Sequence, residues 1–267
     1  MTDIASQGMP LPSRLGVTAR LEDGHLVLGL EPQPETFHHG VVRASVISYL
    51  VDVVAGVPLD NDPDFWTLTT DMTVRARPLP APGQISTVGS VLRRGKRSAT
   101  CLVELTSDGG EPYATGAIGF ARIPRKEGDP PKPRVALEEF PDILRGPGTL
   151  TRPLRQEAGI EVVDAAGGTV QVELTSDLLN PAGTLQGAMV ALVAEAAAED
   201  LLEARSGSPV VVTDLDLRYL QKTHLGPVRT RSRLLGTGPL DPVQVELVDL
   251  STDQVTTLVY VRAVAVP

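Results

Sequence analysis

The chain repeats itself at a spacing of 143 residues. The segment Gly40–Asp52 aligns without a gap with Gly183–Glu195, and Thr70–Arg75 aligns in the same register with Thr213–Arg218. A register held over roughly seventy residues is too long for a solenoid unit and is about the size of a small domain. The sequence therefore predicts two copies of one fold, and functional residues have to be assigned on the pair.

Each copy begins with two kinds of periodic segment. Gly16–Leu30 and Gly159–Leu174 alternate between apolar and polar residues and are interrupted by glycine in a turn, a pattern typical of a β-hairpin. Apolar residues then recur every three to four positions in Val41–Val54 and Leu185–Ala204, with little charge. This spacing predicts one helix per copy, buried on most sides.

Four further alternating segments follow each helix and predict antiparallel strands. In the first copy they are Trp66–Arg77, Gly83–Arg93, Ser98–Thr106 and Tyr113–Ile123, and in the second Val210–Leu220, Gly226–Leu235, Val243–Leu250 and Val255–Val266.

One long helix combined with a run of antiparallel strands is the hotdog arrangement, in which a curved sheet wraps the helix. Two such sheets are expected to pair, because their edge strands would otherwise keep unsatisfied backbone groups. The sequence thus predicts an α+β double hotdog, with two antiparallel sheets joined edge to edge and each wrapping a central helix.

The domain boundaries follow from the composition along the chain. Residues 1–13 are polar and contain proline, which predicts a flexible arm. Hotdog domain 1 is expected at 14–124 and hotdog domain 2 at 156–267. Proline and charge dominate the segment between them, so 125–155 is interpreted as a linker with a short helix near Leu137–Leu144.

Charge and cysteine usage exclude several functional classes. The net charge of −9 and a pI near 5.0 disfavour broad attraction to nucleic acid or to an anionic membrane. No apolar run approaches the roughly 18 residues needed to cross a bilayer. The single cysteine, Cys101, excludes an intrachain disulfide and fits a reducing cytoplasm, and its alternating context predicts a packed strand thiol.

The residues around the second helix resemble the PaaI-like branch of the hotdog thioesterase superfamily, in a fused, tandem form. Asn180–Glu195 is similar to the family signature of Asn, Gly, His-Gly-Gly and an acidic residue nine positions after the His. Leu50–Gly56 of the first copy resembles a later family segment. Both copies lack the family His, since Gln186 stands there in one copy and Arg43 in the other.

This resemblance implies an acyl-thioester hydrolase acting on acyl-CoA, without a metal or another cofactor. Cleavage needs donors that polarise the carbonyl, as a helix N-terminus provides, and a carboxylate that attacks or activates water. The alternative is a non-catalytic double hotdog that binds acyl-CoA or a lipid-like ligand, or serves as a scaffold. The missing His favours that alternative. The resemblance also implies a homodimer of tandem chains.

In the family, the acidic residue comes from the helix of the opposite subunit. Transferred to this chain, the loop before one helix faces the acid of the other copy. Site one then pairs Asp52 with Asn180, Gly183, Gln186 and Gly187. We favour this site because it keeps the family's glycines, which let a substrate approach the backbone closely.

Site two pairs Glu195 with His38, His39, Gly40 and Arg43. Its loop has Arg43 followed by alanine where the family has glycine, so access to the backbone is poorer. Without further nearby ligands, the two histidines do not predict a metal site.

Structural roles are the competing interpretations of the site-one residues. An acid within an apolar helix is costly to bury without a partner, so Asp52 is read either as catalytic or as a polar contact between helices. Asn180 is either a ligand contact or a turn residue. Gln186 either faces the ligand or binds backbone.

A basic turn between two predicted strands adds three candidate substrate-binding residues. Arg94, Lys96 and Arg97 suit the phosphates of coenzyme A. Solvated turn charge is the alternative interpretation.

Overall fold

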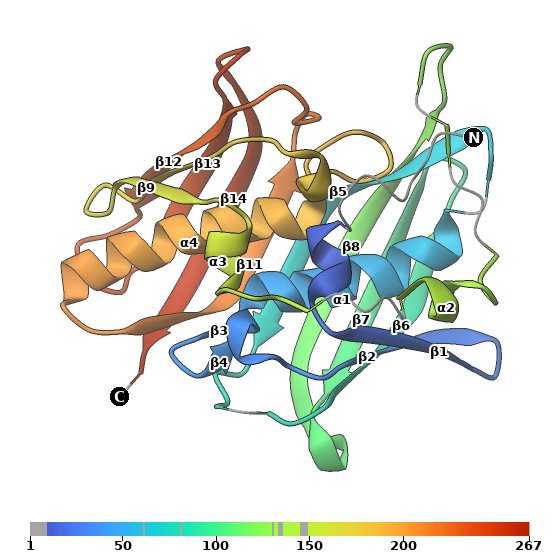
Figure 1. Cartoon of the computed structure of the whole chain (residues 1–267), viewed down its shortest axis with the longest axis horizontal. Helices are drawn as coiled ribbons and strands as arrows, with labels where there is room; N and C mark the ends of the chain where they lie inside the picture. The colour runs from blue at the N-terminus through green and yellow to red at the C-terminus, as the bar shows by residue number, and fades with distance from the viewer. Residues whose placement is uncertain are drawn as a thin grey trace.

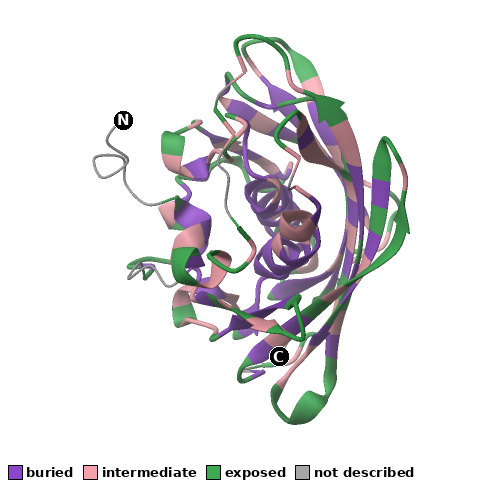
Figure 2. Cartoon of the chain, turned by 90° about the vertical axis from the view of Figure 1, so that its right-hand side faces the viewer, coloured by how far each residue is buried: buried purple, intermediate pink, exposed green. Residues whose placement is uncertain are grey.

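The structure, a computed structural model, describes residues 10–60, 62–80, 82–129, 131–132, 136–144 and 149–266. A 12-stranded antiparallel sheet curves around two helices that lie side by side on its concave face (Figures 1 and 2). These helices are α1 (Ala44–Gly56) and α4 (Gly187–Ser206). No helix among the described residues is both long and apolar enough to span a lipid bilayer.

The remaining elements follow the predicted order along the chain. The first half of the sheet holds β1 (Val17–Glu22), β2 (His25–Leu30), β5 (Phe65–Ala76), β6 (Ile85–Arg94), β7 (Ser98–Thr106) and β8 (Pro112–Pro124). The second half holds β9 (Glu161–Asp164), β10 (Thr169–Val172), β11 (Val210–Tyr219), β12 (Val228–Leu234), β13 (Val243–Asp249) and β14 (Gln254–Ala265). Outside this sheet lie the small hairpin of β3 (Phe37–His38) and β4 (Val41–Val42) and the short helices α2 (Phe140–Leu144) and α3 (Leu154–Glu157).

The strands form one continuous sheet, in the order β1-β2-β6-β7-β8-β5-β11-β14-β13-β12-β10-β9. The two halves are joined edge to edge, as predicted, but they form one sheet around both helices (Figure 2), and the prediction of two sheets that each wrap one helix is corrected. The halves merge because β5 and β11 pair as neighbours over Asp71–Arg75 and Asp214–Arg218. In that pairing Thr73 lies opposite Asp216, and its hydroxyl donates a hydrogen bond of 3.2 Å to the carboxylate 143 residues away.

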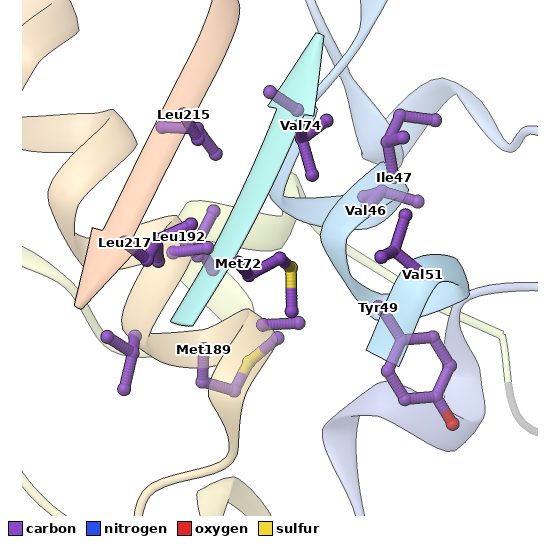
Figure 3. Close-up of a cluster of buried hydrophobic side chains, with 14 of the residues drawn as sticks. Val46, Ile47, Tyr49, Val51, Met72, Val74, Met189, Leu192, Leu215 and Leu217 are labelled. Carbon is purple, nitrogen blue, oxygen red and sulfur yellow. The ribbon is translucent and has the colours of Figure 1, made fainter. Parts of the chain in front are cut away.

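The hydrophobic core includes the region where β5 meets β11 under the two helices (Figure 3). Alternate residues of a strand share one face, and Met72, Val74, Leu215 and Leu217 are all fully buried on the face toward the helices. Figure 3 shows these four with Val46, Ile47, Tyr49 and Val51 of α1 and Met189 and Leu192 of α4. Buried apolar area of this kind is the main stabilising contribution to the fold.

The two helices run antiparallel, as predicted, because the start of each contacts the middle of the other. The N–H of Ala44 donates to the carboxylate of Glu195, and the side chain of Gln186 reaches Asp52. The first helix begins later than the predicted Val41, because Val41 and Val42 pair with β3 instead.

The predicted arm and linker contain ordered structure. Residues 1–9 lie outside the described residues, but Leu11 is fully buried in a short 3-10 turn, so the loose arm does not extend to residue 13. In the linker, α2 lies within the predicted short helix. The ammonium of Lys132 donates a 2.7 Å hydrogen bond to Asp60, and Leu154 is fully buried, which ties the linker to the rest of the fold.

Candidate active site

Asp52 lies on α1 and is held by side chains from two other elements. Thr69 of β5 donates a hydrogen bond of 2.7 Å to its Oδ1, and Gln186 before α4 donates one of 3.3 Å to its Oδ2. Burial raises the pKa of Asp52 to about 6, against the opposing effect of the Thr69 hydrogen bond. A carboxylate with this pKa is ionised at neutral pH and is a better base than an ordinary aspartate.

Thr69 reaches Asp52 because of a β-bulge in β5. Thr69 pairs with Phe120 of β8, the next pair is Asp71 with Gly119, and Thr70 is left as the extra residue. A bulge of this kind turns the side chains on one side of it by one position. Strict alternation from Met72 would have put Thr70 on the concave face, which is why sequence periodicity did not identify Thr69.

Gln186 connects the start of α4 to Asp52. Its Oε1 accepts hydrogen bonds from the N–H groups of Ala188, at 2.7 Å, and Met189, at 3.2 Å, so it caps the helix. Because Oε1 faces those donors, the amide Nε2 must point toward the carboxylate. Of the two roles that the sequence left open for Gln186, the structure shows the hydrogen bonds to backbone, and the same side chain also contacts the candidate acid.

Gly187 contributes the first backbone donor of α4. Within the described chain its N–H has no acceptor, and the positive end of the helix dipole adds to its attraction for a negative charge. A Cβ at this position would lie 3.2 Å from the hydroxyl of Tyr219 and 3.5 Å from Asp52 Oδ2. The glycine thus keeps open a space beside the carboxylate.

Asn180 and Gly183 shape the loop that leads into α4. Asn180 Oδ1 accepts hydrogen bonds from the N–H groups of Ala182 and Thr184, at 3.0 and 3.2 Å. Gly183 has a φ of 73°, a conformation that favours glycine. No hydrogen bond joins Asn180 to Asp52, so the structure gives Asn180 the turn role that the sequence had left as an alternative.

The carboxylate of Glu195 occupies the start of α1. It accepts hydrogen bonds from the N–H of Ala44 at 2.7 Å, the N–H of Ser45 at 3.3 Å and the hydroxyl of Ser45 at 2.5 Å. Burial raises the pKa of Glu195, with Glu199 adding to this effect and Arg43 opposing it. Only 1% of this side chain is exposed, so the acid of site two already fills the space that a substrate oxygen would need.

Arg43 is buried in an ion pair and is not turned toward an open site. Its guanidinium donates hydrogen bonds of 3.0 and 2.8 Å to both carboxylate oxygens of Glu199, and only 5% of Arg43 is exposed. The same side chain lies 3.6 Å from Glu195. The expected substrate-binding role of Arg43 therefore has no support in this arrangement, which is that of a buried charge network.

A comparison of equivalent positions shows how the two sites differ. The bulge of β5 recurs in β11 between Val212 and Asp214, so Val212 stands where site one has Thr69. Ala44 stands where site one has Gly187. Site two therefore lacks both the hydroxyl that holds the acid and the glycine that opens the backbone. The aligned repeats contain this signal, because Thr69 aligns with Val212.

His38, His39 and Glu203 form a cluster of potential metal ligands at the edge of site two. Their ligand atoms lie within 4.8 Å of one another, and His39 has a φ of 46° just before Gly40. However, Arg43 donates to Nδ1 of His38 at 3.3 Å, which leaves the ring proton of neutral His38 on Nε2. That nitrogen has no free lone pair for a metal, so the cluster fits the hydrogen bond of 2.7 Å between His39 and Glu203 better than a metal site.

The basic turn lies at the same end of the sheet as Asp52. Arg94 of β6 pairs with Ala99, Ala99 pairs with Phe120, and Phe120 pairs with Thr69. Cross-strand partners share a face, and three strand spacings amount to about 14 Å. Arg94 is therefore exposed on the concave side about 14 Å across the sheet from Thr69, and Lys96 and Arg97 are exposed in the adjoining turn.

Comparisons with known proteins place the chain in a fold. No family model matches it, and no curated protein sequence matches it. A solved structure described as a thioesterase II from Thermobifida fusca aligns with 98% of this chain and 99% of its own, at a TM-score of 0.62 and 16% identity. The solved structure of the tesB protein of Mycobacterium avium subsp. paratuberculosis aligns with 96% of this chain and 98% of its own, at a TM-score of 0.63 and 12% identity.

A third solved structure, a hot dog fold protein from Alicyclobacillus acidocaldarius, covers 96% of this chain and 98% of its own, at a TM-score of 0.56 and 11% identity. At these low identities the likeness concerns the fold, and the chain has the hotdog fold over nearly its whole length. Membership of the PaaI-like branch stays a prediction.

Proposed function

We propose that the protein hydrolyses acyl thioesters at site one, with Asp52 as the catalytic base. The observation that carries this proposal is the position of the Asp52 carboxylate, which is held between Thr69 and Gln186 beside the free N–H of Gly187. A base, two groups that orient it and a backbone donor for an oxyanion are the parts that thioester hydrolysis needs.

The reaction uses one water molecule. Asp52 takes a proton from the water as its oxygen attacks the carbonyl carbon, and the electron pair of the C=O bond moves to the oxygen. The C–S bond then breaks, and the leaving thiolate takes the proton back from Asp52. The products are a carboxylic acid and a free thiol, and Asp52 is ionised again.

Two features support Asp52 as a base. Its raised pKa, about 6, brings it close to neutral pH, where a base is both ionised and strong enough to accept a proton. Thr69 and Gln186 bind one carboxylate oxygen each, which restricts rotation of the group. The oxyanion is stabilised by Gly187 N–H at the positive end of α4.

In this proposal only site one is active. Glu195 shares the helix position of Asp52, but its carboxylate is bound to Ala44 and Ser45 and lies beside the buried Arg43. A group that is already fully hydrogen-bonded in a dry environment would have to break those bonds before it could act, which is costly.

We infer acyl-CoA as the substrate class from the basic turn. Arg94, Lys96 and Arg97 are exposed at the end of the sheet that holds Asp52, and guanidinium and ammonium groups bind phosphates well. The thioesterase II structure with the same fold supports thioester hydrolysis in general, and the choice of acyl-CoA rests on the basic turn.

The test is thioester hydrolysis by the purified chain across a panel of acyl-CoA chain lengths, followed by detection of free thiol. Turnover that disappears in Asp52→Asn supports the proposal. If no acyl-CoA is cleaved, calorimetric titration with the same panel tests the non-catalytic binding alternative.

A further inference from the structure

Tyr219, the last residue of β11, brings a phenol to the start of α4. Its hydroxyl donates a hydrogen bond of 3.1 Å to the carbonyl oxygen of Gly187. The sequence did not single it out, because its equivalent 143 residues earlier is Ala76 and no motif surrounds it. Tyr219 is half-buried.

The phenol of Tyr219 and the carboxylate of Asp52 both border the side-chain position of Gly187. An atom at the position of a Cβ on Gly187 would lie 3.2 Å from the Tyr219 hydroxyl and 3.5 Å from Asp52 Oδ2. The backbone N–H of the same residue has no acceptor within the described chain. Because Gly187 has no side chain, a substrate group that packs against its Cα would be bordered by the phenol of Tyr219 and the carboxylate of Asp52.

The hydroxyl of Tyr219 is free to change its partner. The carbonyl of Gly187 is in the first turn of α4, where the helix itself supplies a donor four residues later. A carbonyl oxygen has two lone pairs, so it stays satisfied when the phenol turns away. Rotation about the C–O bond of the phenol therefore redirects the proton without leaving a buried acceptor unpaired.

The phenol also keeps its proton over the working range of the enzyme. Burial, with the nearby Asp52 carboxylate adding to its effect, raises the pKa of Tyr219 well above its ordinary value. Tyr219 is therefore a hydrogen-bond donor at every pH at which Asp52 is a base.

We propose that Tyr219 is a catalytic residue, whose hydroxyl donates a hydrogen bond to the thioester carbonyl oxygen and, with the N–H of Gly187, stabilises the oxyanion. This inference rests on the proposed thioesterase activity. In the reaction the proton stays on the phenol, and the hydrogen bond strengthens as negative charge develops on the substrate oxygen.

Tyr219→Phe removes the donor and keeps the ring. Loss of one oxyanion donor is expected to lower kcat by roughly 10²–10³-fold while KM changes less than about threefold, because the bond strengthens in the transition state. The pH at which kcat/KM is half-maximal should stay that of the wild type, since Asp52 keeps Thr69 and Gln186. Thermal unfolding by circular dichroism checks that the fold is retained.

Tyr113→Phe is the matched control. Tyr113 is 1% exposed, and its hydroxyl has no partner among the described residues. It precedes Phe120, the partner of Thr69, by seven positions along β8, about 23 Å at the rise of a strand. Its substitution should leave kcat unchanged.

The outcomes separate this proposal from the function on which it rests. A wild-type chain that cleaves no acyl-CoA contradicts both. A wild-type chain that is active and loses activity in Asp52→Asn, but keeps its kcat in Tyr219→Phe, overturns the Tyr219 proposal alone. A rise in KM with unchanged kcat, or a lowered melting temperature with no kcat effect, assigns Tyr219 a structural role and overturns it as well.

Discussion

Gln186 and Asp52 are 134 residues apart in the chain, and a hydrogen bond of 3.3 Å joins their side chains. The same amide caps α4 through its oxygen. This contact couples the candidate base on one helix to the N-terminus of the other. The antiparallel packing of α1 and α4 is what makes the contact geometrically possible.

Asp52→Asn should abolish thioester turnover while the fold is retained, because an amide has nearly the same shape but cannot accept the proton. Loss of the base is expected to lower kcat by roughly 10²–10⁴-fold. Free-thiol detection with acyl-CoA measures this effect. A variant with wild-type turnover would exclude Asp52 as the base.

The same substitution should increase stability at neutral pH. The pKa of Asp52 in the folded chain, about 6, lies above its ordinary value of 3.8, so the ionised carboxylate is less favourable in the folded than in the unfolded state. This cost is nearly absent below pH 4, grows between about pH 4 and 6, and is constant above that range. At pH 7–8 the free energy of unfolding of Asp52→Asn should therefore exceed that of the wild type by about 1–3 kcal/mol. Denaturant titration measures this difference, which should disappear at pH 4.

Thr69→Val should impair the site without disturbing the strand. The Thr69 hydrogen bond lowers the pKa of Asp52, so its loss should move the acidic limb of the pH–kcat/KM profile to higher pH and lower kcat. Val212→Thr is the control, because Val212 occupies the equivalent position beside the second acid. We expect it to leave the profile unchanged, and equal effects of both substitutions would argue against the single-site assignment.

Glu195→Gln should change stability and leave catalysis intact. The carboxylate accepts three hydrogen bonds at the start of α1, and an amide cannot accept all three from the same positions. A loss of about 1–3 kcal/mol in the free energy of unfolding is expected, with kcat within about twofold of the wild type. If this variant loses turnover and Asp52→Asn does not, the active site is site two.

Arg43→Met should destabilise the chain by about 3–5 kcal/mol near neutral pH, because it leaves buried carboxylates without their cation. Burial raises the pKa values of Glu195 and Glu199, with Arg43 opposing the rise. Protonation removes the uncompensated charge, so the difference from the wild type should narrow as pH falls. Urea unfolding at several pH values measures it, and a pH-independent loss would point to packing alone.

The repeat and the periodicity of the sequence were enough to predict most of the architecture. Helices and strands were placed close to their observed bounds because their apolar residues follow the period of each element. The contact of Asp52 with Gln186 was predicted as well. It depends on two antiparallel helices and on the alignment of the copies, and both leave a signal in the sequence.

The tertiary structure decided three things that local patterns do not encode. The sequence predicted that the halves join edge to edge, but only the fold showed that β5 and β11 are the strands that form the junction. Thr69 faces Asp52 because a bulge at Thr70 shifts the alternation of β5.

The third feature that the tertiary structure decided is the difference between the hydrogen bonds of Glu195 and those of Asp52. The longer side chain of Glu195 reaches the N–H groups of Ala44 and Ser45, whereas the amide of Gln186 caps the other helix and leaves Gly187 free. Which hydrogen bonds a buried carboxylate makes depends on groups more than a hundred residues away along the chain. The sequence by itself determined that there are two comparable acids, and only the packing of the helices decided which of them binds the backbone at the start of the other helix.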